Sequence, residues 1–189
     1  SGGGLLLPDV ADSSGTIRHL AAGAGKDGNI YIVDRDNMGG FNPSTNNIYQ
    51  ELAGILSSEF GMAAYFNNTL YYGSTNSPLY AFSFQSGKFS ATPSSQTAVS
   101  FAYPGTTSGI SANGTQNGIV WALQSSEGSP AVLHAYDAAN LGHELYNSNQ
   151  AANGRDSFGN GNKFITPLIA NGKVFVGTPS GVAVFGLLQ

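Results

Sequence analysis

Cysteine is absent from the 189-residue chain, which excludes a disulfide framework, a thiolate metal site and a cysteine nucleophile. Charge is also scarce, because charged residues make up 10% of the sequence against roughly a quarter in an average soluble domain. The formal net charge of −4 indicates no basic surface, so nucleic acid is not an expected partner. No apolar run approaches the ~20 residues of a membrane span, so membrane insertion is not expected either.

Turn-forming and strand-forming residues take the place of the missing charges. The chain contains 26 Gly, 11 Phe and 9 Tyr, and Asn, Ser and Thr fill most other polar positions. This composition is typical of short strands joined by many turns. No window shows convincing helical periodicity, and the length suits one domain. Low charge with abundant Asn, Ser and Thr favours an extracellular or periplasmic protein.

One pattern recurs four times along the chain. Each copy has a short apolar strand, a small residue, a turn rich in Gly, Ser, Asn or Pro, and a second apolar strand. The small residues stand at positions 23, 73, 122 and 177, about fifty residues apart. The four stretches are "HLAAGAGKDGNIYIVD", "TLYYGSTNSPLYAFS", "IVWALQSSEGSPAVLHAYD" and "VFVGTPSGVAVFG".

Further strands flank these hairpins. A strand precedes each hairpin, and the polar turns 67–68, 117–118 and 171–172 supply the positive φ that tight hairpins require. A fourth, outer strand is predicted in the first three units only, at Asn47–Leu52, Phe89–Ser95 and Glu144–Ser148. The units are therefore expected near residues 1–52, 60–96, 108–149 and 164–189, and the last lacks its outer strand.

A four-stranded antiparallel unit repeated every fifty residues predicts an all-β fold of the β-propeller type. One such sheet cannot bury both faces alone, whereas sheets stacked around an axis bury their apolar positions between neighbours. The alternative is a β-sandwich whose strands look repetitive.

Two segments carry a family resemblance: "GKDGNIYIVDRDN" (25–37) and "ITPLIANGKVFVGTPSGVAVFGLL" (165–188). They resemble quinoprotein-type (PQQ-like) β-propeller repeats, with "YNSNQAANGRDSFGNGNKFITP" (146–167) similar to a branch common in exported proteins of acidobacteria and related soil bacteria. The likeness extends over essentially the whole chain, which resembles the last four blades of such a propeller. It implies a propeller fold and export.

The same family implies a cofactor, which this sequence is not expected to bind. Quinoprotein dehydrogenases hold PQQ with a cysteine pair, a stacking Trp, a Ca²⁺ site and a catalytic Asp. This chain has no Cys, and its one Trp, Trp121, falls inside a predicted strand. Neither PQQ nor Ca²⁺ is therefore an expected cofactor.

Candidate ligand-binding residues gather in the loops predicted to share one face of the repeats. In a chain so poor in charge, a cluster of charged and aromatic side chains on loops is the best place to expect a ligand. The candidates are Lys26, Asp27, Glu59, Tyr103, Glu127, Arg155, Asp156, Asn162 and Lys163. The longest and most polar crossing is Ala151–Phe164, where Arg155 either grips a carboxylate or sugar hydroxyls or ties the loop to its neighbours.

No catalytic constellation or metal site is predicted. The three His residues have no metal-ligand spacing, and no Gly-x-Ser-x-Gly nucleophile elbow occurs. We therefore expect a non-catalytic module that binds carbohydrate or protein through one loop face. A quinoprotein-type oxidoreductase fragment and a purely structural scaffold are the alternatives.

The two ends of the chain raise a further expectation. The start Ser1–Gly4 has no signal-peptide character, which suggests a processed product or a piece of a longer protein. The missing outer strand of the last unit then lies upstream of Ser1, in a propeller of seven or eight blades. Alternatively, four blades stand alone and self-associate, because uncovered edges and faces favour association.

Overall fold

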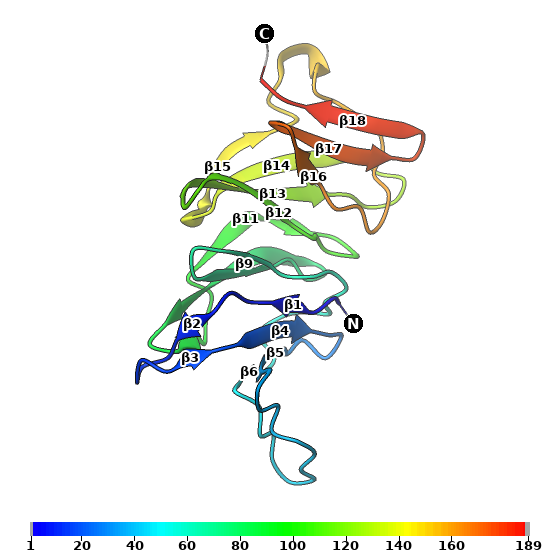
Figure 1. Cartoon of the computed structure of the whole chain (residues 1–189). Coiled ribbons are helices and arrows are strands. Elements are labelled where there is room, and N and C mark those ends of the chain that lie inside the picture. Colours follow the sequence, from blue (N-terminus) through cyan, green and yellow to red (C-terminus); the bar gives the residue numbers. More distant parts are fainter. Residues whose placement is uncertain (1, 188–189) are drawn as a thin grey trace.

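The computed structural model describes residues 2–187 and is all-β, with several small antiparallel sheets (Figure 1). The first sheet has the order β1–β4–β5–β6, and a small hairpin, β2–β3, lies beside it. These strands are β1 (Leu5–Leu6), β2 (Val10–Ala11), β3 (Ile17–Arg18), β4 (Leu20–Ala24), β5 (Ile30–Asp34) and β6 (Gln50–Leu52). Within residues 2–187, no helix has the length and apolar character needed to cross a membrane.

The second and third sheets repeat this arrangement. In the second sheet β7, β8 and β9 pair in sequence, and β9 pairs on its other side with both β10 and β11. In the third sheet the order is β12–β13–β14–β15. The bounds are β7 (Ala64–Phe66), β8 (Thr69–Tyr72), β9 (Ser77–Gln85), β10 (Lys88–Phe89), β11 (Ser95–Phe101), β12 (Gly109–Asn113), β13 (Gln116–Gln124), β14 (Val132–Asp137) and β15 (Asn140–Asn147).

The last sheet has three strands, in the order β16–β17–β18. They are β16 (Leu168–Ala170), β17 (Lys173–Thr178) and β18 (Gly181–Phe185). A single-turn 3₁₀ helix, η1 (Ala152–Gly154), lies in the long connection between β15 and β16. The sequence predicts that the final strand continues to Leu188, but that residue lies outside the described part of the chain.

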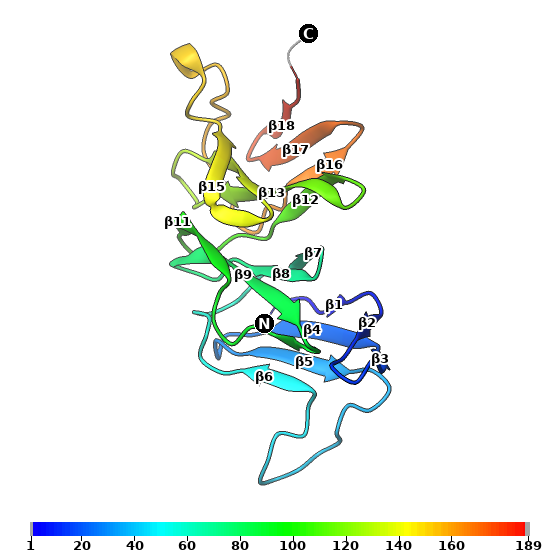
Figure 2. The same cartoon turned by 90° about the vertical axis from the view of Figure 1, so that its left-hand side faces the viewer.

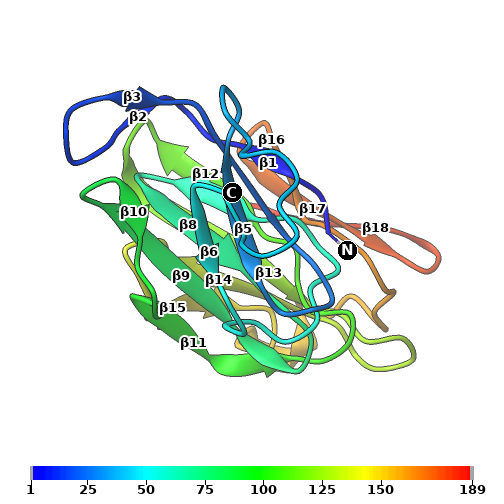
Figure 3. The same ribbon diagram turned by 90° about the horizontal axis from the view of Figure 1, so that it is seen from below.

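The sheets stack face to face, from the first sheet at one end to the last sheet at the other (Figures 1 and 2). Strand β8 shows why they do so: Leu70 and Tyr72 point into the core shared with the first sheet, while Tyr71 points into the core shared with the third. Because successive strand side chains point to opposite faces, a strand that is apolar at every position needs a partner on both sides. The view along the stack shows the sheets overlapping one another (Figure 3).

Three apolar cores lie between successive sheets, and they decrease in size toward the C-terminus. The first includes Leu20, Ile32 and Phe82, all without exposed surface. The core between the third and last sheets contains four buried residues: Leu123, Leu133, Val174 and Val176. Over residues 2–187 the stack stays open and does not close into a ring, so the model establishes the all-β stack of sheets and leaves the propeller as an interpretation.

The outer strand of the second unit differs from the sequence prediction. Phe89–Ser95 was expected to form it, but the strand along β9 is β11, which begins at Ser95 and pairs Ser95 with Ala81 and Phe101 with Ser77. Phe89 is buried instead through the short hairpin of β10 with the end of β9, where its ring packs edge-on against Phe84. The predicted span Phe89–Ser95 therefore holds the end of β10 and the first residue of β11, and the residues between them are not in a strand.

Candidate functional site

Three aromatic side chains from three separate connections meet on the loop side of the stack. Phe60 comes from the β6–β7 connection, Tyr103 from β11–β12 and Phe164 from β15–β16. The Phe60 and Tyr103 ring centres lie 5.2 Å apart at 85°. Phe164 lies 6.5 Å from Phe60 and 6.2 Å from Tyr103. We call Phe60, Tyr103 and Phe164 the aromatic platform.

Two of the three platform rings are exposed to solvent, and the third, Phe60, is half-buried. Tyr103 is 44% exposed and Phe164 is 62% exposed. Phe164 also has a φ of +62°, in the left-handed region that a bulky L-residue rarely adopts. Holding a phenylalanine there costs free energy of order 1–3 kcal/mol. Backbone strain that presents an apolar ring to solvent points to a binding role.

Two lysines and a glutamate surround the rings. The Lys26 Nζ lies 5.3 Å from the Phe60 ring centre, and the Lys163 Nζ lies 5.8 Å from that of Tyr103. Lys163 also forms an ion pair with Glu127, 2.5 Å from Nζ to Oε2. This hydrogen bond raises the pKa of Lys163 and lowers the pKa of Glu127, so both groups stay charged at neutral pH.

Glu59 lies beneath the platform and holds it in place. Its side chain is buried, and Oε1 accepts hydrogen bonds from the backbone N–H groups of Phe60 (3.0 Å) and Gly61 (2.7 Å). Its Oε2 is buried without a partner among residues 2–187. Burial raises the pKa of Glu59, while the two backbone N–H bonds act in the opposite direction. The carboxyl group therefore fixes the turn that presents Phe60.

The loop that carries Phe164 is tied to the β13–β14 connection. The Ser125 hydroxyl donates to the Asn162 carbonyl oxygen (2.5 Å) and accepts from the Asn162 N–H (3.0 Å). Gly161 N–H donates to the Ser129 carbonyl at 2.8 Å. A Cβ at Gly161 would lie 2.9 Å from the Ser125 Cα, so only glycine allows this approach. Gly161 therefore serves the packing of this loop.

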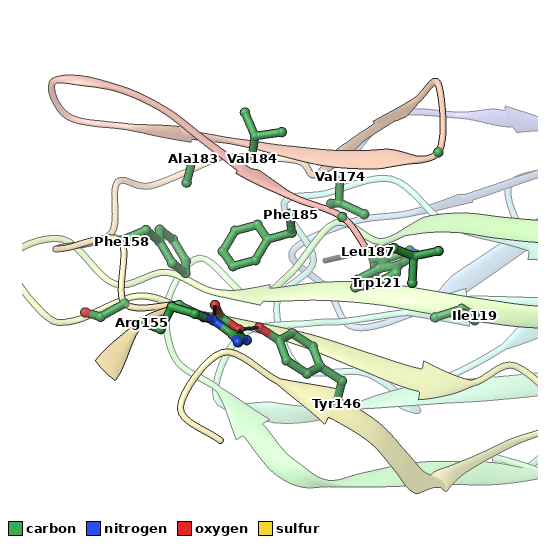
Figure 4. A pocket seen from close by; sticks show the side chains of 14 residues that line it. Ile119, Trp121, Tyr146, Arg155, Phe158, Val174, Ala183, Val184, Phe185 and Leu187 are labelled. Atoms are coloured by element: carbon green, nitrogen blue, oxygen red, sulfur yellow. Dashed lines mark hydrogen bonds and ion pairs between the residues drawn. The ribbon is translucent and has the colours of Figure 1, made fainter. Parts of the chain in front are cut away.

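A second feature is a groove of about 610 Å³ between the last sheet and the third (Figure 4). Its apolar wall includes Trp121, Phe158 and Phe185, and Figure 4 shows Phe185 and Ala183 of β18 pointing into it while Val184 points away. Phe158 and Phe185 pack edge-on with ring centres 5.3 Å apart. We call this cavity the β18 groove.

Arg155 and Asp156 lie at the β18 groove together with Tyr146. Arg155 donates from Nε (2.7 Å) and Nη2 (2.9 Å) to the two carboxylate oxygens of Asp156, which also accepts from the Tyr146 hydroxyl at 2.6 Å. The Arg155 guanidinium, followed by the Tyr146 hydroxyl, lowers the pKa of Asp156 to about 2. The forked contact predicted for a ligand is thus made within the chain.

The predicted site residues divide into groups. Lys26, Tyr103, Glu127 and Lys163 lie together at the aromatic platform, with Glu59 buried below it. Asn162 supports Lys163, because its side-chain oxygen accepts the Lys163 N–H at 3.0 Å. Asp27 turns back to its own hairpin, where its Oδ2 accepts from the Tyr31 hydroxyl at 2.5 Å.

Sequence reasoning missed two of the three platform rings. Phe60 and Phe164 each adjoin a predicted residue, Glu59 and Lys163, but were not themselves singled out. The sequence did hold a signal for both rings, because each is an aromatic residue in a polar connection, outside the strands that would bury it. The expectation of one shared face for all nine candidates was too broad, because Arg155 and Asp156 line the β18 groove.

Comparison with known proteins bears on the fold. No protein-family model matches the chain, and no curated protein matches it. Among solved structures, the computationally designed Ika8 protein is similar at 12% identity and a TM-score of 0.58, covering 96% of this chain and 45% of that one. The computationally designed Ika4 protein is similar at 13% identity and a TM-score of 0.54, covering 89% and 85%. The chain thus spans less than half of Ika8, and the likeness concerns the fold alone.

Proposed function

We propose that this chain is an exported binding module, a partial β-propeller of four blades, that binds carbohydrate on the aromatic platform. The repeated unit of antiparallel strands and the face-to-face stacking of the sheets support the propeller interpretation. Low charge and the resemblance to exported propeller repeats support export.

The observation that carries the proposal is the convergence of three rings, of which Tyr103 and Phe164 are exposed and Phe60 is half-buried. Phe60, Tyr103 and Phe164 come from three different connections, and one of them is held in a strained backbone conformation. Rings needed only for packing would be covered, as Tyr71 and Tyr72 are at 1% exposure. Exposed apolar surface of this kind marks an interaction site.

The polar groups around the aromatic platform suit a sugar ligand. An aromatic face packs against the apolar C–H face of a sugar ring, and the hydroxyl groups then need polar partners at the rim. Lys26 and Lys163 supply donors beside the rings, and the Glu127 carboxylate supplies acceptors. The loop that carries Phe164 is already held by its hydrogen bonds to Ser125, so the protein loses less conformational entropy when a ligand binds.

The residues present do not fit a PQQ site, and the proposal uses no cofactor. Trp121 lines the β18 groove, and its indole N–H donates to the Ser111 hydroxyl at 2.9 Å. The aromatic platform contains no tryptophan to stack on a quinone. The family's paired cysteines have no counterpart in the sequence.

The test is retention on insoluble polysaccharides and cell-wall fractions, followed by a glycan array. The wild-type protein is compared with Tyr103→Ala, Phe164→Ala and the double variant. The matched control is Phe41→Ala, because Phe41 is 95% exposed and lies in the loop between β5 and β6 (Figure 1). Each platform substitution is expected to weaken binding by at least about fivefold, corresponding to ~1 kcal/mol per lost stacking contact.

Phe41→Ala is expected to bind like the wild type. Failure of the wild-type protein on every glycan and cell-wall fraction would rule out the carbohydrate assignment. Equal loss of binding in Phe41→Ala would show nonspecific adhesion by exposed rings and would contradict a defined platform.

A further inference from the structure

The charged groups around the aromatic platform leave one positive charge without a partner. Lys163 is neutralised by its ion pair with Glu127. Lys26 also lies beside the rings, with its Nζ 5.3 Å from the Phe60 ring centre, and it forms no ion pair with a carboxylate among residues 2–187. The platform therefore carries a positive charge at Lys26, although the whole chain has a formal net charge of −4.

The carboxylates of the same two connections are engaged elsewhere. Asp27 follows Lys26 in the sequence, but its Oδ2 accepts the Tyr31 hydroxyl at 2.5 Å. Glu59 is buried beneath the rings, where its Oε1 accepts two backbone N–H groups. Burial raises the pKa of Glu59, which disfavours a negative charge at this position. Neither carboxylate pairs with the Lys26 ammonium group, so that group is available to a ligand.

The backbone that carries Lys26 is anchored to the connection that carries Phe60. The Ser58 hydroxyl donates to the Lys26 carbonyl oxygen at 3.1 Å, and the Glu59 N–H donates to the Gly25 carbonyl oxygen at 3.1 Å. The Lys26 ammonium group lies over the Phe60 ring, and a cation in that place is attracted by the ring. The positive charge and the rings therefore form one preorganised surface.

We propose that the ligand of the aromatic platform is an acidic polysaccharide, in which one sugar unit stacks on the rings and an anionic group of the polymer pairs with Lys26. This specificity rests on the proposed carbohydrate function and goes one step further, because it names the class of sugar. An ammonium group forms a stronger hydrogen bond with an anion than with a neutral hydroxyl group. The anionic group is the carboxylate of a uronic acid or a sulfate ester, and the choice of probes separates these two sources.

The test compares polysaccharides that differ in charge but share a sugar backbone. Three matched pairs serve as probes: polygalacturonate and its methyl ester, alginate and its methyl ester, and dextran sulfate and dextran. The affinity of the whole protein for each probe is measured at one fixed salt concentration. The wild type is expected to bind the acidic member of at least one pair about fivefold or more tightly than the neutral member. The pair that shows the difference identifies carboxylate or sulfate as the anion.

Variants of Lys26 assign the preference to this side chain, which is exposed. Lys26→Gln removes the charge and is expected to reduce the preference to within twofold, while binding of the neutral member stays within twofold of the wild type. Lys26→Arg keeps the charge and is expected to keep the preference. The matched control is Lys173→Gln, which removes the same charge from an exposed position at the start of β17 and should leave the preference unchanged.

A variant of Glu127 is expected to act in the opposite direction. Glu127 is 66% exposed at its side chain, so Glu127→Gln leaves the packing intact and frees the Lys163 ammonium group from its ion pair. The platform then carries two unneutralised positive charges. The preference for the acidic member is expected to rise by a further threefold or so.

The outcomes separate this specificity from the carbohydrate function itself. Equal binding of both members of every pair would overturn the acidic specificity and leave the carbohydrate function standing. Binding of no polysaccharide would overturn both. A preference that survives in Lys26→Gln, or that falls equally in Lys26→Gln and Lys173→Gln, would show that Lys26 does not select the anion and would also overturn the proposal.

Discussion

The aromatic platform and the β18 groove offer two different kinds of surface. At the platform, Glu59 and Ser125 hold the backbone of two loops by hydrogen bonds, and the rings of Tyr103 and Phe164 are exposed. At the β18 groove, the edge strand β18 pairs with β17 alone among residues 2–187, and its side chains line one wall. The first kind of surface is the one used in the proposed binding of a sugar to aromatic rings.

The difference follows from how completely each sheet is built. Each of the first two cores lies between two sheets that both have an outer strand. The last core is small, and one of its two sheets, β16–β17–β18, has no outer strand among residues 2–187.

Core substitutions should show the largest contrast between the two ends of the stack. Phe82 has no exposed surface and lies in the first core, so Phe82→Ala is expected to lower the free energy of unfolding by about 3–5 kcal/mol. Phe185 is half-buried beside the last core, and Phe185→Ala should cost less, about 1–2 kcal/mol. Urea unfolding of both variants measures the difference. Equal losses would contradict a weaker last sheet.

Hydrogen exchange should separate the same two regions without mutation. Amides of β17 and β18 are expected to exchange at least tenfold faster than those of β13 and β14, because the last sheet has few buried contacts and an open edge. Amide exchange followed by mass spectrometry or NMR gives the rates by segment. Slow, uniform exchange across all four strands would show that the last sheet is as stable as the others.

The strain at Phe164 predicts a smaller effect. Phe164→Gly and Phe164→Ala both remove the ring, but only glycine adopts a φ of +62° freely. The Gly variant is therefore expected to be more stable than the Ala variant by about 1 kcal/mol, while both lose glycan binding. Urea unfolding of the two variants tests this order. An Ala variant as stable as the Gly variant would argue against strain at this position.

The smallest expected effect is a pH dependence of the free energy of unfolding that comes from Glu59. Burial raises its pKa in the folded state, so the stability it contributes is full below the unfolded-state pKa and falls as pH rises through the folded-state pKa. Glu59→Gln cannot ionise and should lack this decline between mildly acidic and neutral pH. Urea midpoints of both proteins over that range test the difference. Parallel pH curves would show that Glu59 is not the titrating group.

The repeat pattern predicted the fold better than the details of its edges. Spacing of small residues and turns identified four units, and each contains the predicted central hairpin. The outer strand of the second unit was predicted too early in the sequence. Phe89 is buried by the short hairpin of β10 with β9, whereas the longer strand β11 has few apolar residues and is held by its pairing with β9. Pairing between distant segments is not visible in a local pattern.

The candidate site was predicted in part for the same reason. Lys26, Tyr103, Glu127 and Lys163 were expected to share one loop face, and the structure brings these four together. The three rings come from connections that are far apart in the sequence. Their meeting depends on tertiary contacts, so a local sequence pattern does not predict it. Arg155 was expected either to grip a ligand or to tie its loop to its neighbours, and its bidentate contact is made to the adjacent Asp156.

Self-association stays a prediction for this chain. The end sheets expose apolar side chains, among them Leu6 at 66%, Leu168 at 63% and Val182 at 64%. Such surfaces favour association when they are contiguous. Light scattering over a range of concentrations tests it, and a monomer throughout would count against it.

The most direct test of the platform is an NMR titration with a soluble fragment of the retained polysaccharide. The ring signals of Phe60, Tyr103 and Phe164 are expected to shift together with one saturation curve, while the indole N–H signal of Trp121 at the β18 groove stays unchanged. Shifts confined to Trp121, or spread equally to the exposed ring of Phe41, would contradict sugar binding at the aromatic platform.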